Sequence, residues 1–113
     1  MEKHYKLDRV REMADNDQDF IMALAAAFIE EVPEDADRLR RAVPEGDFYE
    51  TYQAAHKMKP TIELFGLDIF DELIVVQDWG KFEQSDKNVD TELQKVLTAV
   101  EKATAEIKFD FNL

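Results

Sequence analysis

The chain has 113 residues, and its 26 Asp and Glu against 14 Lys and Arg give a formal net charge of −12 at pH 7. This length predicts one domain over residues 1–113, and 45% apolar residues with only three Gly and three Pro favour a folded helical chain over an all-β one. The acidic excess argues against binding to nucleic acid or to anionic membranes, and without cysteine there is no disulfide or thiolate metal site.

The first two helices are predicted from apolar spacing. Residues 7–14 predict a short helix, and Asp17 in the acidic turn that follows is a good N-cap for a second helix over about residues 18–43. Pro33 lies inside this second pattern. Because the apolar spacing continues in phase across Pro33, we expect a kinked but continuous helix. It ends at the turn over residues 44–47, where Asp47 can cap the next helix.

The acidic turn has the alternating carboxylates that open a calcium-binding loop, but we interpret it as a helix cap. A calcium loop needs Gly at its sixth position and Glu at its twelfth, and here these positions hold Phe20 and Ala26. The Glu-x-x-His motif of di-iron bundles is also absent. The sequence therefore predicts no metal site.

Three further helices follow. We expect a third from near Phe48 to Gly66, a fourth over residues 67–80 and, after a polar loop, a fifth over about residues 89–108. Four amphipathic helices with short connections predict an all-α fold, an up-down antiparallel four-helix bundle with the short N-terminal helix packed on one end. Five aromatic residues at core spacing are expected to pack inside: Phe28, Phe48, Tyr52, Phe65 and Phe70.

Basic side chains are unevenly distributed along this acidic chain. Arg38, Arg40 and Arg41 lie among acids of the second helix, where we expect exposed i,i+3 and i,i+4 ion pairs worth only tenths of a kcal/mol. Between residues 42 and 80 the only basic side chains are Lys57 and Lys59, against eight Asp and Glu. A local positive charge in that stretch is therefore a specific feature.

The two lysines follow His56 on the third helix. Helical spacing places His56, Lys59, Pro60 and Glu63 on a stripe beside the apolar side. Pro60 removes the hydrogen bond to the His56 carbonyl at a cost of ~3 kcal/mol, which indicates a constraint other than stability. A surface histidine flanked by ordinary lysines remains the alternative interpretation.

The segment Ala55-His56-Lys57-Met58-Lys59, with Gly66 ten residues after the histidine, resembles the signature of histidine-containing phosphotransfer (HPt) domains. That signature is Ala-His-x-Leu-Lys-Gly with a later Gly, and the resemblance extends over most of the chain. It implies a helical bundle in which His56 is the phosphoacceptor, Lys59 neutralises phosphate charge and Gly66 closes the helix. Pro60 departs from the family, which usually has Gly there.

The resemblance implies a phosphorelay intermediate in two-component signal transduction. His56 would accept a phosphoryl group from an aspartyl phosphate of a response-regulator receiver domain and pass it to another receiver. The chain would be a phosphoryl carrier rather than an enzyme, without a cofactor of its own, because Mg²⁺ is expected on the receiver. Lys57, Pro60, Glu63 and Gly66 would form the binding surface around His56, for receiver domains and a hybrid histidine kinase.

Two other hypotheses stay open. The chain could be a non-phosphorylated module that docks receiver or kinase domains, for which His56 would be dispensable, or a dimerising bundle of a kinase or phosphatase. The dimerising bundle would need an ATP-binding segment or a partner subunit, and the sequence has no phosphate-binding loop. The N-terminal residues lack the apolar core of a signal peptide, and the longest apolar run is too short to span a bilayer. We therefore expect a cytoplasmic protein, and we separately expect it to be a monomer.

Overall fold

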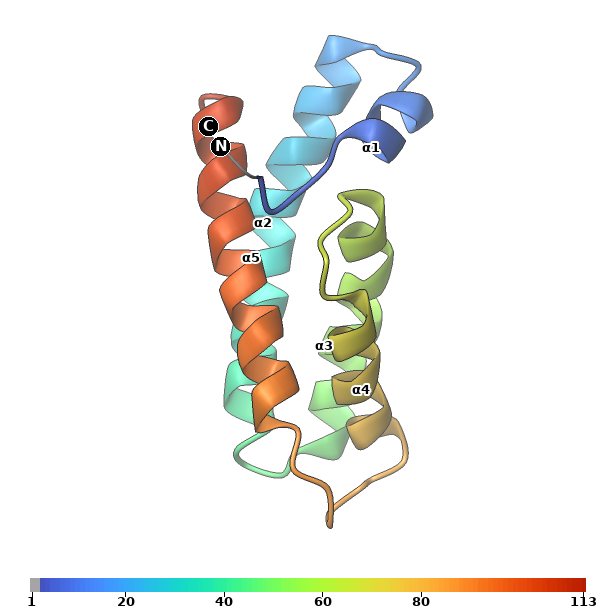
Figure 1. Ribbon diagram of the computed structural model, residues 1–113, viewed down its shortest axis with the longest axis vertical. Helices are drawn as coiled ribbons and strands as arrows, with labels where there is room; N and C mark the ends of the chain where they lie inside the picture. Colours follow the sequence, from blue (N-terminus) through green and yellow to red (C-terminus); the bar gives the residue numbers. More distant parts are fainter. Residues whose placement is uncertain (1–2) are drawn as a thin grey trace.

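The computed structural model describes residues 3–113, which form five helices and no strand within that range (Figure 1). The helices are α1 (Asp8–Met13), α2 (Gln18–Ala42), α3 (Phe48–Leu64), α4 (Phe70–Lys81) and α5 (Asp90–Asp110). The all-α prediction is confirmed, with boundaries shifted by a few residues. The largest shift is at α4, which begins at Phe70 because residues 65–69 form the turn after α3.

The four longer helices lie side by side as a bundle (Figure 1). Helices α2 and α4 each contact both α3 and α5, and α1 packs on α2 at one end. Each long helix contributes its apolar side to one core, whose largest fully buried side chains include Phe28, Leu39, Phe65, Leu73 and Ile107. The rings of Phe28 and Phe65 lie 4.9 Å apart between centroids, so the core joins α2 to the end of α3.

The helix caps match the predicted ones. The Asp17 carboxylate accepts hydrogen bonds from the amides of Asp19 and Phe20 at the start of α2, and Asp47 accepts one from Glu50 at the start of α3. Such caps satisfy amides that have no partner within the helix and are each worth about 1 kcal/mol. Pro33 lies inside α2 without ending it, as the in-phase apolar pattern predicts.

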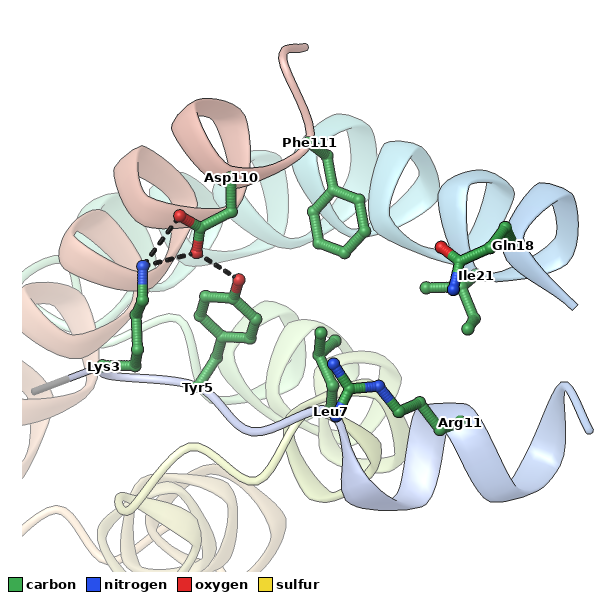
Figure 2. Close-up of a pocket in the computed structure, with 8 residues that line it drawn as sticks. All are labelled: Lys3, Tyr5, Leu7, Arg11, Gln18, Ile21, Asp110 and Phe111. Atoms are coloured by element: carbon green, nitrogen blue, oxygen red, sulfur yellow. Dashed lines mark hydrogen bonds and ion pairs between the residues drawn. The ribbon is translucent and has the colours of Figure 1, made fainter. Parts of the chain in front are cut away.

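The segment before α1 is tied to the C-terminal end of α5, a contact that the sequence did not predict (Figure 2). The Lys3 ammonium lies 2.7 Å from both carboxylate oxygens of Asp110, and the Tyr5 hydroxyl donates to the same carboxylate. The hydrogen bond from Lys3 lowers the pKa of Asp110, whereas burial and then the bond to Asp110 raise the pKa of Tyr5. The Lys6 amide donates to the Phe65 carbonyl at 2.7 Å, so the segment also reaches the end of α3.

Helices α3 and α4 approach most tightly at Gly80. A Cβ atom on Gly80 would lie 2.6 Å from the Phe48 carbonyl oxygen and 2.8 Å from the Tyr52 nitrogen, both backbone atoms of α3. Beside this contact the Trp79 ring packs on the Phe48 ring with 4.5 Å between centroids. The two helix backbones therefore meet one turn before His56.

We expect Gly80→Ala to lower the free energy of unfolding. Both clashes are with backbone atoms, so moving the helices apart should cost about 2–3 kcal/mol, the upper part of the range for overpacking. Helix propensity returns about 1 kcal/mol, so we expect a net loss of about 1–2 kcal/mol in urea unfolding. Asp71→Ala, at an exposed position of the same helix, is the control and should change stability by about 0.5 kcal/mol or less. A Gly80→Ala protein as stable as the control would contradict the close contact.

Candidate functional site

His56 lies in the middle of α3 on the side away from the core, and its side chain is exposed. Its neighbours Ala55 and Met58 are buried, at 0% and 1% exposure. Because successive residues turn by about 100° around a helix, burial of these two neighbours directs His56 outward. Packing of the core therefore does not account for a histidine at this position.

Lys59 follows one turn later on the same side of α3. Three residues of helix bring it to within about 60° of His56 around the axis. Lys59 is half-buried, and it forms no salt bridge with any residue in the range 3–113. Its ammonium group is thus not committed to a carboxylate of the described chain.

Lys57 lies on the side of α3 that faces α2. Its ammonium nitrogen is 3.4 Å from a carboxylate oxygen of Asp35, a residue of α2 that is only 2% exposed. A buried carboxylate needs cationic or hydrogen-bonding partners to offset its desolvation. Lys57 therefore has a structural contact between two helices, and its expected part in docking stays a prediction.

Arg38 is the main partner of the same buried carboxylate. One guanidinium nitrogen donates to Asp35 at 3.0 Å, and two others donate to the two carboxylate oxygens of Glu50 in α3, each at 2.9 Å. The two hydrogen bonds between Arg38 and Glu50 raise the pKa of Arg38 and lower the pKa of Glu50. The expectation that Arg38 forms only exposed pairs within its own helix is wrong, because α3 lies close enough to offer Glu50.

The His56 ring is stacked on the ring of Tyr52, one turn earlier in α3. The centroids are 5.5 Å apart and the ring planes differ by 10°. Among the five aromatic residues expected to pack inside, Phe28 and Phe65 are buried, whereas Phe48, Phe70 and Tyr52 are only partly buried. The expectation is therefore met in part, and the Tyr52 ring contacts His56. The four-residue spacing of two flat side chains on one helix could have indicated this contact.

Pro60 is exposed and lies inside α3, which continues to Leu64 without a break. Because proline has no N–H group, the His56 carbonyl receives no helical hydrogen bond from residue 60. The imidazole is therefore flanked on the helix surface by Tyr52 on one side and a compact proline ring on the other.

Glu63 and Gly66, the other predicted binding residues, lie at the end of α3, close to the N-terminal part of the chain. Glu63 lies 3.2 Å from a guanidinium nitrogen of Arg9 in α1. Gly66 has a φ of +62°, and the amide of Leu67 donates to the Ile62 carbonyl across it, which is the glycine-dependent way of ending a helix. The predicted end of the third helix at Gly66 is confirmed.

A cleft of about 470 Å³ lies between the N-terminal segment, the start of α2 and the end of α5 (Figure 2). Its lining comprises Lys3, Tyr5, Leu7, Arg11, Gln18, Ile21, Asp110 and Phe111. None of the predicted site residues belongs to this lining. The cleft is therefore separate from the surface around His56.

Comparison of the chain with protein-family models, with curated proteins and with solved structures finds no match. Within residues 3–113, none of the helices combines the length and the apolar composition that crossing a bilayer requires. The resemblance to HPt domains therefore remains a hypothesis, supported by the quoted motif and the geometry around His56.

The contact of Arg38 with the buried Asp35 carboxylate can be tested by mutation. We expect Arg38→Ala to lower the free energy of unfolding by about 2–3 kcal/mol, because the carboxylate would stay buried with only the longer contact to Lys57. Arg40→Ala is the control: Arg40 is exposed and pairs with Asp37 in its own helix, so a change of about 0.5 kcal/mol or less is expected. Equal losses for the two variants in urea unfolding would contradict the connection between α2 and α3.

Proposed function

We propose that this chain is a phosphorelay carrier of the HPt type. His56 accepts a phosphoryl group from an aspartyl phosphate of a receiver domain, and another receiver takes it up. One observation carries the proposal: an exposed imidazole on α3 has, one turn away on the same side, a lysine that forms no salt bridge within residues 3–113. A phosphoryl acceptor needs this combination of an accessible nucleophile and a nearby cation.

The packing order of the helices supports the same class. Helices that follow one another from α2 to α5 are neighbours, and α5 returns to α2. This order suits an up-down antiparallel four-helix bundle, with α1 at one end. In such a bundle the outer side of α3 is available to a partner along its whole length, and His56 lies near its middle.

The chemical step makes modest demands on this chain. A lone pair of the neutral imidazole attacks phosphorus, so an N–P bond forms while the P–O bond to the receiver aspartate breaks. The aspartate carboxylate leaves with the bonding electrons, and the proton on the other ring nitrogen stays in place. Because the transition state is loose, catalysis is mainly positioning and charge neutralisation, and the receiver is expected to supply Mg²⁺ and the aspartate.

Lys59 is the residue that neutralises charge on this side of α3. A phosphoryl group adds about −1.5 to −2 charge to a chain whose formal net charge is already −12. Lys57 shares its charge with the buried Asp35, whereas Lys59 has no such carboxylate partner within residues 3–113. Lys59 therefore stabilises both the phosphorylated histidine and the transition state that leads to it.

Replacement of the acceptor should abolish phosphorylation. We expect His56→Gln to take no label from a receiver domain charged with radioactive acetyl phosphate, because glutamine has no nucleophilic ring nitrogen. His4→Gln, at the only other histidine, is the control and should be labelled like the wild type. The wild-type label should be acid-labile and base-stable. A label that persists in His56→Gln would refute the assignment, and a wild-type chain that binds receivers but takes no label would be a non-phosphorylated docking module.

Loss of the lysine charge should slow transfer without unfolding the chain. We expect Lys59→Ala to reduce the rate of transfer from a charged receiver about tenfold or more, with an unchanged free energy of unfolding. Lys59→Arg keeps the charge and should recover part of the rate, and Lys102→Ala removes a lysine from α5 as the control. Rapid-quench measurement at saturating receiver gives the rates. A wild-type rate in Lys59→Ala would remove Lys59 from the mechanism.

A further inference from the structure

The His56 ring lies nearly parallel to the ring of Tyr52. Nearly parallel planes, 10° apart, with centroids 5.5 Å apart form the offset arrangement that aromatic rings favour. Helical side chains lean toward the N-terminus of their helix, so His56 leans back over the residue four positions earlier. The Tyr52 ring lies beside the imidazole, and the His56 side chain remains exposed.

Tyr52 is itself held by the contact between α3 and α4. The close approach of Gly80 leaves no room for a Cβ atom beside the Tyr52 nitrogen, at 2.8 Å. The preceding residue, Thr51, is fully buried, and its hydroxyl donates to the Asp47 carbonyl at 2.8 Å. The backbone that carries the phenol ring is thus fixed by a neighbouring helix, so the ring is attached at a constrained point of α3.

We propose that Tyr52 is a positioning residue for His56: its ring holds the imidazole in the orientation that meets the aspartyl phosphate. The inference rests on the proposed function, since it names a residue that serves the same transfer. An exposed histidine samples several staggered rotamers, and ordering it only at the encounter costs conformational entropy and slows reaction. The role needs an aromatic ring and not the hydroxyl, so phenylalanine should fulfil it.

The stack can be tested by NMR without any transfer reaction. The ring current of Tyr52 should shift the carbon-bound proton resonances of the His56 ring, which are assigned by their loss in His56→Gln. We expect Tyr52→Leu to move these resonances toward those of an isolated exposed histidine, and Tyr52→Phe to retain them. Tyr49→Leu is the matched control, because Tyr49 lies on the same helix, is 75% exposed and makes no ring contact with His56.

The positioning role is tested by transfer rates. At saturating charged receiver, we expect Tyr52→Leu to be about three- to tenfold slower than the wild type, with receiver affinity unchanged and with the rate restored in Tyr52→Phe. Tyr52→Met repeats the test with a second non-aromatic side chain in case Tyr52→Leu does not fold. If the His56 resonances do not move, or if the non-aromatic variants transfer at the wild-type rate, the positioning role of Tyr52 is wrong and the proposed function is unaffected. The same holds if Tyr52→Phe is as slow as Tyr52→Leu. A wild-type chain that takes no label would overturn the proposed function and this role with it.

Discussion

Burial of one side of α3 is the constraint from which the geometry of the candidate site follows. Ala55, Met58 and Ile62 are all at or near zero exposure, and their packing against α2 and α4 sets the rotation of the helix about its axis. That rotation turns His56 outward, places half-buried Lys59 about 60° from it around the helix axis and leaves Lys57 facing α2. A one-residue change in this rotation would move the imidazole by about 100° and separate it from a partner surface. The core therefore sets the position of the candidate site without contributing a side chain to it.

The two lysines beside His56 differ in their ion-pair partners, which the composition alone does not reveal. In a chain with a formal net charge of −12, most ammonium groups would be expected to find a carboxylate. Lys57 does so at the buried Asp35, where Arg38 already supplies the stronger contact and also reaches Glu50 across the helix pair. Arg38 and Lys57 thus stabilise the α2–α3 contact, whereas Lys59 forms no salt bridge within residues 3–113.

The features that could be predicted from the sequence are those that depend on residues near one another along the chain. Apolar spacing predicted all five helices, Asp17 and Asp47 were expected as caps, and Gly66 as the end of α3. The contacts that were missed join segments far apart in the sequence. They are the paired hydrogen bonds of Arg38 to Glu50, the close approach of α4 to α3 at Gly80, and the ion pair of Lys3 with Asp110. These contacts depend on the distances between packed helices, and the periodicity of apolar residues gives no information about those distances. Tyr52 was assigned to the core because its spacing fits, although a ring at the edge of an apolar stripe can equally contact the next polar side chain.

A carrier must both take up a phosphoryl group and give it away, and a chase experiment measures the two steps in sequence. The chain would be labelled by a charged receiver domain, separated from it, and mixed with a second, uncharged receiver in the presence of Mg²⁺. The phosphorelay function predicts that label leaves His56 and appears as an acid-stable, base-labile aspartyl phosphate on the second receiver. Label that never enters the chain, or that leaves it only as inorganic phosphate at the same rate with and without receiver, would contradict that function.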